Sequence, residues 1–269
     1  MKSGEIIINI DKETEKAIAA KLRHAGCVFA EDEARLLVTE AQSLESLTEM
    51  ADRRATGVPL EYVLGWADFC GIRIAVEPGV FVPRRRTEFL VKQAARLDMQ
   101  GAVVADICCG TGAVGAALDK ALGGIELYAA DIDPHSVQCA RRNLASIGAL
   151  VLEGDLCKPL PSVLRGRVDI LVANAPYVPT RAIRLLPRES RNHESKAALN
   201  GGIDGLDFHR RIASEACQWL APLGHVIVET SRKQAWQTFE IFAQHGLITR
   251  AVHDSELNAA AVIGTKPVL

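Results

Sequence analysis

Residues 102–122 read AVVADICCGTGAVGAALDKAL. The first six residues, AVVADI, are typical of a buried strand, and the glycine-containing turn after them leads into a helix, AVGAALDKAL. Further strand patterns follow, most of them separated by helical ones, at 126–133, 149–155, 168–177, 225–230, 247–254 and 259–265. This alternation predicts an α/β fold: a Rossmann-like, doubly wound, mostly parallel sheet that is covered by helices on both faces.

The chain before this region has a different pattern. Residues 11–54 are rich in Ala, Leu, Glu and Lys, and their apolar residues recur at helical spacing, which predicts two or three helices. The segment 57–86 contains turn residues and the alternating Ile72, Ile74 and Val76, which predicts a hairpin or short strands. We therefore expect a helical domain over 1–56, a β-hairpin linker over 57–86 and an α/β domain over 87–269.

Composition narrows the possible function classes. Of the 269 residues, 48% are hydrophobic and 24% are charged, which is ordinary for a protein with a core of its own. No apolar run predicts a membrane span, and acidic residues come too early in the chain for a signal peptide. The net charge of −2 gives no support to a chain-wide affinity for nucleic acid.

Cysteine and histidine usage bears on compartment and metal binding. Seven cysteines, an odd number, favour reduced thiols in a cytoplasmic protein over a disulfide framework. The adjacent Cys108 and Cys109 lack the second pair of ligands that a structural zinc site needs. The seven histidines are scattered and show no metal-ligand spacing. We therefore expect no metal site.

Three successive strand patterns each carry an aspartate at or near their end: Asp106, Asp131 and Asp155. Ligands of a doubly wound sheet bind beyond the carboxyl ends of its strands, where Gly110 and Gly112 let the backbone come close to a ligand. Asp131 can accept both hydroxyls of a ribose, and Asp155 can accept a hydrogen bond from an adenine amino group. Each acid alone is better explained as a helix cap or a loop charge, but the three together predict a nucleoside site. The sequence has no phosphate-binding lysine motif, so we expect no triphosphate.

Residues 174–177, Asn-Ala-Pro-Tyr, end the strand pattern VDILVA. Asn and Pro are ordinary turn residues, so this tetrapeptide can simply terminate a strand. It can also hold a planar NH2 group between hydrogen-bond acceptors and a flat ring. The nucleoside site predicted beside it favours the second interpretation.

The sequence resembles the class I S-adenosylmethionine-dependent methyltransferases and, more narrowly, the protein-(glutamine-N5) methyltransferases that modify peptide-chain release factors. The resemblance spans nearly the whole chain. It lies in DEARLL (32–37), PLEYVLG (59–65), VPRRRTE (82–88), DICCGTG (106–112), ADID (130–133), GDL (154–156), NAPY (174–177) and ALNGGIDGLDFHRRI (198–212). It implies a seven-stranded sheet, a substrate-recognition role for residues 1–56, and conversion of S-adenosylmethionine to S-adenosylhomocysteine. It also implies a protein partner that presents a glutamine on an exposed loop, with no membrane involved.

The resemblance assigns roles to particular residues of this chain. Those implied to bind the cofactor are Asp106, Cys108, Cys109, Gly110, Thr111, Gly112, Asp131, Ile132, Asp155, Leu156 and Asn174. Those implied to bind and orient the substrate amide are Asn174, Ala175, Pro176 and Tyr177, with Arg84 as a further substrate contact. The chain departs from the family pattern at Cys108 (a glycine there), Leu156 (often an aromatic), Ala175 (a proline), Arg85 (a proline) and Arg86 (an acid).

The tetrapeptide suggests a mechanism for amide methylation. An amide nitrogen is a poor nucleophile, because its lone pair is delocalised into the carbonyl group. We expect the Asn174 side-chain oxygen and the Ala175 carbonyl each to accept one N–H of the substrate amide, which orients the nitrogen and stabilises its developing charge. Pro176 keeps Ala175 extended, and Tyr177 covers the amide plane. The methylated amide is a strong acid, so we expect no dedicated general base.

Two other interpretations stay open: amino methylation of a nucleic-acid base or a small molecule, and a non-catalytic binding role. Arginines at 84–86, 181, 184, 188 and 191 are compatible with methylation of a nucleic-acid amino group, although an arginine-rich loop or contact with an acidic partner protein explains them better. Cys108 is compatible with a binding protein that has kept the fold and lost catalysis. Glu229, at the end of the HVIVE strand pattern, can approach the cleft, but the sequence gives it no role.

Overall fold

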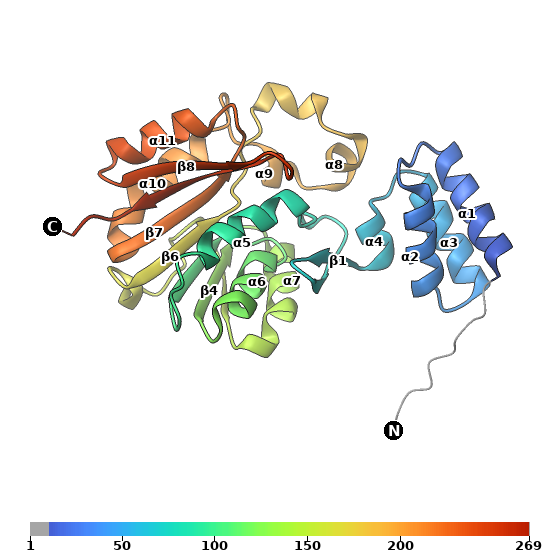
Figure 1. Ribbon diagram of the computed structural model, residues 1–269, viewed down its shortest axis with the longest axis horizontal. Helices are drawn as coiled ribbons and strands as arrows, with labels where there is room; N and C mark the ends of the chain where they lie inside the picture. Colours follow the sequence, from blue (N-terminus) through green and yellow to red (C-terminus); the bar gives the residue numbers. More distant parts are fainter. Residues whose placement is uncertain (1–10, 269) are drawn as a thin grey trace. The chain divides into compact units, whose positions relative to one another are not determined.

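The computed structural model describes residues 11–268 (Figure 1). Contacts within the chain divide it into two compact units. The first unit contains the described residues up to Trp66 together with Pro187–His193, and the second contains Ala67–Leu186 and the residues from Glu194 onward. We call them the helical unit and the sheet unit. The chain therefore passes from one unit to the other at three points in the sequence.

The helical unit consists of short amphipathic helices. They are α1 (Lys12–His24), α2 (Ala30–Glu40), α3 (Leu44–Ala55), α4 (Leu60–Leu64) and, from the later segment, α8 (Arg188–His193). Two of them begin at capping residues: the Asp11 carboxylate accepts the Thr14 N–H at 2.7 Å, and Ser43 and Ser46 form a reciprocal capping box. Leu22, Leu37, Leu47 and Ala51 are fully buried between the helices. The helices predicted over 11–54 are therefore present.

A buried ion-pair cluster joins three segments of the helical unit. The Arg54 guanidinium donates to both oxygens of Glu33, at 2.6 and 3.1 Å, and to Glu189 at 2.7 Å. Arg54 and Glu33 are buried, whereas Glu189 is partly exposed. Because Glu189 belongs to α8, this cluster ties the later segment to α2 and α3.

The sheet unit is built on a seven-stranded, mostly parallel sheet, which confirms the predicted fold class. Its strands stand in the order β5-β4-β3-β6-β7-β9-β8, and β9 is antiparallel to both of its neighbours. The strands are β3 (Val103–Ile107), β4 (Glu126–Asp131), β5 (Leu150–Glu153), β6 (Val168–Ala173), β7 (Leu220–Thr230), β8 (Ile248–Asp254) and β9 (Ala259–Thr265).

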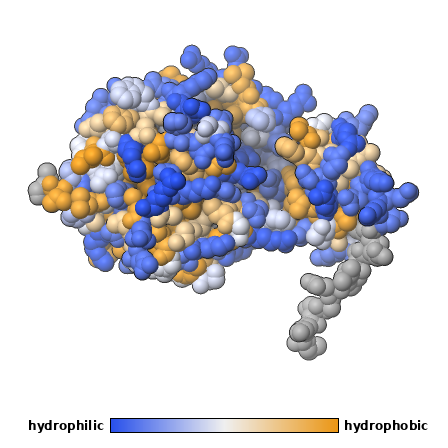
Figure 2. Space-filling model, in the orientation of Figure 1, coloured by the Kyte–Doolittle hydropathy of each residue, from blue (hydrophilic) through white to orange (hydrophobic). Residues whose placement is uncertain are grey.

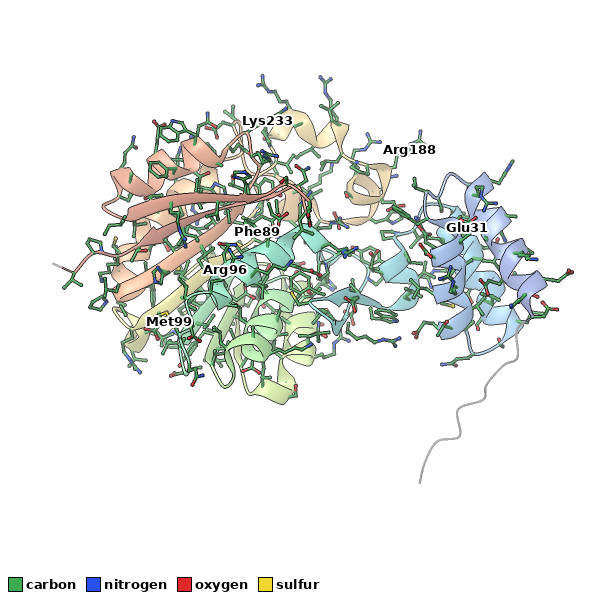
Figure 3. All side chains as sticks on the ribbon, in the orientation of Figure 1. Glu31, Phe89, Arg96, Met99, Arg188 and Lys233 are labelled. Atoms are coloured by element: carbon green, nitrogen blue, oxygen red, sulfur yellow. The ribbon has the colours of Figure 1, made fainter. Side chains whose placement is uncertain are left out.

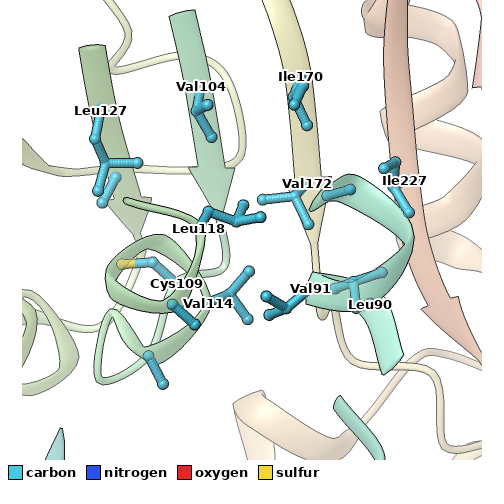
Figure 4. Close-up of a cluster of buried hydrophobic side chains, with 14 of the residues drawn as sticks. Leu90, Val91, Val104, Cys109, Val114, Leu118, Leu127, Ile170, Val172 and Ile227 are labelled. Carbon is cyan, nitrogen blue, oxygen red and sulfur yellow. The ribbon is translucent and has the colours of Figure 1, made fainter. Parts of the chain in front are cut away.

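Helices cover both faces of this sheet, because alternate residues of the buried strands are apolar on both sides (Figure 1). On one face lie α5 (Glu88–Ala95), α6 (Ala113–Leu122) and α7 (Pro134–Asn143), and on the other lie α10 (Asp207–Trp219) and α11 (Ala235–Gln244). Figure 4 shows the first layer, in which Leu90 and Val91 of α5 and Leu118 of α6 pack against strand residues such as Val104 and Val172. On the opposite face, Ile212 and Phe242 pack against Leu171 and Val226.

The remaining elements are short. The predicted hairpin is formed by β1 (Trp66–Phe69) and β2 (Ile72–Ala75). The polar stretch 180–205 contains short helices that the sequence analysis did not predict: η4 (Thr180–Leu185), α8 and α9 (Lys196–Leu199). Single 3-10 turns lie at η1 (Arg85–Thr87), η2 (Ala145–Ile147) and η3 (Ser162–Leu164).

Asn143, at the end of α7, ties the hairpin to the turn after β3. Its side-chain Nδ2 donates to the carbonyls of Ala75 and Thr111, both at 2.9 Å, and its Oδ1 accepts the Ala75 N–H at 2.9 Å. The strand β2 is thereby fixed to the sheet unit by side-chain contacts as well as by the chain itself.

The surface is mixed in character. Figure 2 shows hydrophilic and hydrophobic residues interspersed on the face in view. In Figure 3 the labelled Phe89 belongs to α5 and is buried, whereas Arg96, just after that helix, is exposed. Among the described residues, every helix is too short or too polar to cross a membrane.

Candidate active site

A cavity of about 410 Å³ opens beyond the carboxyl ends of β3, β4 and β6. Its wall is formed by the turn after β3, by the ends of β4 and β6, and by residues 195–200. Every lining residue belongs to the sheet unit. This is the edge of the sheet at which ligands of doubly wound folds bind.

The turn between β3 and α6 presents backbone to the cavity. Cys108 (φ 57°) and Gly110 (φ 54°) both adopt the left-handed conformation that favours glycine. Gly112 (φ 78°) caps α6 without lining the cavity, and a Cβ on it would lie 2.9 Å from the side chain of Leu144. The backbone geometry thus explains why the family pattern has a glycine at the position that Cys108 occupies in this chain. Of the residues assigned to this turn, Cys108, Cys109, Gly110 and Thr111 line the cavity.

Two carboxylates are fixed beside the turn by backbone N–H groups. Asp131 accepts the Gly110 N–H at 2.8 Å and the Asp133 N–H at 2.9 Å, and Asp106 accepts the Gly115 N–H at 3.0 Å. Burial raises the pKa of Asp106 to about 7 and also raises the pKa of Asp131. Ile132 lines the cavity next to Asp131.

Asp155 and Leu156 follow β5 on the far side of the cavity. Arg211 of α10 donates to both Asp155 oxygens at 2.6 Å, and Lys158 donates to it at 2.7 Å. The hydrogen bonds from Arg211 and Lys158 lower the pKa of Asp155, so this carboxylate is already charge-paired. Phe208 lines the cavity here, with the Arg211 guanidinium 5.6 Å from its ring centroid.

The tetrapeptide 174–177 lines the cavity directly after β6. The Asn174 side-chain Nδ2 donates to the hydroxyl of Thr87 at 3.3 Å, and Thr87 is buried just before α5. Within the part of the chain that the structure describes, no donor reaches the Asn174 side-chain oxygen. The amide group is therefore oriented by its nitrogen, and its oxygen remains available as an acceptor.

Tyr177 is held through its hydroxyl group. The phenol donates to Glu229 Oε1 at 2.8 Å, and Arg86 Nε donates to the same oxygen at 3.2 Å. The Arg86 guanidinium also lies 6.0 Å from the Tyr177 ring centroid. Burial and the nearby Glu229 carboxylate raise the pKa of Tyr177, so the phenol stays neutral.

The structure does not bring Arg84 to the cavity wall. The Arg84 guanidinium is bound to the buried Glu194, and it lies 5.1 Å from the ring centroid of Phe81. Arg86, two residues later, lines the cavity in its place.

Comparisons with known proteins show which family the chain belongs to. The family model described as "Methyltransferase small domain" matches residues 71–202. A release factor glutamine methyltransferase from Geobacter sulfurreducens is 38% identical over 207 residues, which cover 76% of this chain and 72% of that protein. Another, from Mycolicibacterium smegmatis, is 34% identical over 257 residues, which cover 94% of this chain and 88% of that protein. The chain belongs to the release factor glutamine methyltransferase family.

Solved structures show the same fold at lower identity. A methyltransferase from Pyrococcus furiosus has a TM-score of 0.56 and 18% identity, with 74% of this chain and 90% of that chain covered. A T. thermophilus 16S rRNA N2 G1207 methyltransferase, solved with AdoMet and guanosine, has a TM-score of 0.55 and 18% identity. That match covers 75% of this chain and 49% of that chain. At this identity the likeness shows the fold alone.

S-adenosylmethionine is the methyl donor that membership of this methyltransferase family implies, and the charges of the cavity fit it. The cofactor carries a sulfonium, an ammonium and a carboxylate group, so it is a net cation. Arg211 neutralises Asp155 and Arg86 neutralises Glu229, whereas Asp131 and Asp133 have no ion-pair partner within the described chain. Together with the ionised form of Asp106, they outweigh the positive charge of Lys196, which also lines the cavity, so the cavity keeps the negative charge that a cationic ligand requires. The described residues contain no cluster suited to a metal ion.

Sequence reasoning assigned no site role to Thr87, Arg86, Arg211 or Phe208, although all four lie in the segments 82–88 and 198–212 that carry the resemblance. Glu229 gave a signal of its own, because an acid at the end of a strand pattern lies at the ligand-binding edge of the sheet. Its partners, Arg86 and Tyr177, are 143 and 52 residues away in the sequence, so no local spacing indicates them.

Proposed function

We propose that this protein transfers a methyl group from S-adenosylmethionine to the side-chain amide nitrogen (N5) of a glutamine in a peptide-chain release factor. The observation that carries this proposal is the fixed Asn174 side chain, whose nitrogen is held by Thr87 and whose oxygen remains an acceptor beside the cavity. The names of the relatives supply the substrate class. Because release factors act in translation, the proposed reaction is cytoplasmic.

The turn after β3 and the acids around it would hold the cofactor. When bound, S-adenosylmethionine supplies an electrophilic methyl group on a sulfonium. In this proposal Cys108–Thr111 present backbone groups to the methionine part, Asp106 faces its ammonium, and Asp131 with Ile132 binds the ribose. Leu156 and Asp155 border the adenine, and Asp155 acts there together with its partner Arg211.

Two oxygen acceptors would hydrogen-bond to the NH2 group of the substrate amide. The Asn174 side-chain oxygen accepts one N–H, and the Ala175 carbonyl accepts the other. Holding the nitrogen at near-attack distance removes part of the entropic barrier, and the two acceptors stabilise the positive charge that develops on the nitrogen. Every residue has a backbone carbonyl, so alanine at 175 is compatible with this role.

Pro176 and Tyr177 would shape the same pocket. Pro176 restricts the backbone of Ala175 to extended geometry. Tyr177 presents its ring to the amide plane, because its hydroxyl is turned to Glu229. The buried, neutral phenol is not a general base, in agreement with a reaction in which the methylated amide loses its proton readily.

Residues 1–56 are the domain that we propose for recognising the protein partner, and residues 57–86 are the proposed linker, which continues into the sheet unit after Trp66. A partner protein would present the glutamine on an exposed loop. The net charge of −2 does not favour nucleic acid as the direct substrate.

The proposed function is tested with methyl-labelled S-adenosylmethionine and a release factor purified from cells that lack their own glutamine methyltransferase. We expect label in the release factor, and mass spectrometry should place it on one glutamine side chain. Changing that glutamine to glutamate should abolish incorporation. Asn174→Ala should lower kcat by about 100-fold or more, because a displaced substrate loses that much. Gln237→Ala, at an exposed position on α11 outside the cavity, is the matched control.

Three outcomes would contradict the proposal. Label in RNA or DNA, with binding that weakens steeply as salt rises, would assign a nucleic-acid substrate. Failure of the protein to bind S-adenosylmethionine in calorimetry would assign a non-catalytic role. Near-normal methylation by Asn174→Ala would remove the role that we give to the tetrapeptide.

A further inference from the structure

Glu229 is a buried carboxylate that the cavity does not expose. It lies near the end of β7, has 3% of its surface exposed, and is absent from the residues that line the cavity. A carboxylate in such surroundings costs free energy unless its oxygens are hydrogen-bonded. Glu229 therefore needs specific hydrogen-bond donors at this position.

Both contacts of Glu229 are made by one of its oxygens. Tyr177 donates its hydroxyl to Oε1 at 2.8 Å, and Arg86 donates Nε to the same atom at 3.2 Å. The other oxygen, Oε2, is buried and has no hydrogen-bond partner among residues 11–268. Among the described residues, the carboxylate is thus hydrogen-bonded through one oxygen alone.

We infer that Glu229 is a positioning residue for methyl transfer, which sets the orientation of the Tyr177 ring against the substrate amide. The inference rests on the proposed function. A phenol hydroxyl can point toward the substrate or away from it, and these alternatives present different surfaces to the amide. Glu229 holds the hydroxyl away from the substrate, so that Tyr177 presents its ring and not its oxygen to the amide. Arg86 supplies the charge that balances the carboxylate and contacts the same ring.

The unsatisfied oxygen separates this role from a purely structural one. A residue kept for stability alone would be expected to have both oxygens paired. Replacing Glu229 by methionine, which has similar volume and no acceptor, removes a buried carboxylate but leaves the Tyr177 hydroxyl and Arg86 without their acceptor, so the midpoint of thermal unfolding should fall modestly. Catalysis should fall at the same time, because the Tyr177 ring loses its anchor.

The test compares Glu229→Met, Glu229→Gln, Tyr177→Phe and the double variant Tyr177→Phe with Glu229→Met. Glu229→Met should lower kcat by about 10- to 100-fold, as a misplaced group does, with the dissociation constant for S-adenosylmethionine unchanged in calorimetry. Glu229→Gln keeps an oxygen for the tyrosine hydroxyl and should recover most of the rate. On the Tyr177→Phe background, Glu229→Met should cause little further loss, because the hydroxyl that it anchors is gone.

Glu240→Met, at an exposed position on α11, is the matched control and should behave like the wild-type protein. Losses that add in the double variant, an unchanged kcat in Glu229→Met, or weakened cofactor binding equal to the loss of kcat would each overturn the inference. If Glu229→Met does not fold, Glu229→Asp is tested in its place. Its side chain is shorter by one methylene group, which moves the oxygen away from Tyr177 and should lower kcat at constant cofactor affinity. An unchanged kcat in Glu229→Asp would overturn the inference. A wild-type protein that methylates no glutamine would overturn the proposed function instead.

Discussion

The hydroxyl of Thr87 accepts a hydrogen bond from the side-chain amide of Asn174, at 3.3 Å, across 87 residues of sequence. This contact links the segment before α5 to the end of β6. It fixes which end of the Asn174 amide faces the cavity, because a group that accepts from Nδ2 leaves Oδ1 on the other side. Thr87 is buried, so water does not compete for this bond.

Replacing Thr87 by valine should lower kcat by about tenfold, since valine keeps the shape of threonine but does not accept the Asn174 N–H. The amide of Asn174 is then free to rotate and to present its nitrogen to the substrate. Steady-state kinetics on the proposed release-factor substrate measure this, with calorimetry expected to give an unchanged affinity for S-adenosylmethionine. The control is Thr249→Val in β8, which removes a hydroxyl that donates to the Leu247 carbonyl. Equal kinetics in both variants would contradict the prediction.

Replacing Cys108 by glycine should stabilise the protein by about 1 kcal/mol, because the left-handed conformation costs an L-residue roughly that amount. Cys108 adopts φ 57°, whereas its neighbour Cys109 is not among the residues with positive φ. Cys109→Gly should accordingly destabilise the protein, since it removes a buried side chain and adds backbone freedom. Urea unfolding measures both variants. Destabilisation by Cys108→Gly would show that the thiol contributes more packing than the backbone loses in strain.

The affinity for S-adenosylmethionine should fall as the pH drops below about 7, where the buried Asp106 becomes protonated. Burial is the main cause of its raised pKa, opposed by the Gly115 N–H and reinforced by the charge of Asp131. A cofactor ammonium beside Asp106 favours the carboxylate, so binding should release a proton and weaken by about tenfold between pH 8 and pH 6. Calorimetry in buffers of different ionisation enthalpy measures the proton release.

The same group has the opposite effect on the stability of the protein without cofactor. The folded-state pKa of Asp106 lies above its ordinary value of 3.8, so the folded state binds this proton more tightly than the unfolded chain does. The resulting stabilisation of the folded protein is fully present below pH 3.8 and is lost as the pH rises through 7. Asp106→Asn should remove both pH dependences. If cofactor affinity still fell at low pH in that variant, another group would be responsible.

Replacing Arg54 by methionine should destabilise the helical unit by about 3–5 kcal/mol, because it leaves the Glu33 carboxylate buried without its partner. Arg35→Met is the matched control. Arg35 pairs with Asp32 at 3.2 Å on the surface, and such exposed pairs contribute about 0–1 kcal/mol. Hydrogen exchange in α1–α3 reports the stability of this unit. Similar exchange rates in the two variants would show that the buried cluster is dispensable.

The sequence was sufficient for features that depend on local pattern. The apolar runs of β3 and β6 and the helix α6 lie where they were predicted, because burial and periodicity are properties of neighbouring residues. The turn after β3 was recognised from Gly110 and Gly112. The short helices within 180–205 were missed because helices of four to six residues are too short to show a periodic apolar face.

Features that depend on contacts between residues far apart in the sequence could not be predicted from local pattern. Arg84 was expected at the substrate, but Glu194 holds it, and nothing in the sequence links these two residues. Asp155 was expected to accept a hydrogen bond from an adenine amino group, and no sequence pattern indicates that Arg211 of α10 pairs with it. In both cases charged partners came together through the packing of separate elements.

The three passages of the chain between its two units have a consequence for dissection of the protein. Cutting the peptide bond after Trp66 would not release the helical unit as a whole, because Pro187–His193 would stay covalently part of the other fragment. An N-terminal fragment made separately would lack Glu189 and hence one of the two carboxylates that bind Arg54. Limited proteolysis at a single site should therefore yield a nicked protein that still migrates as one species under native conditions.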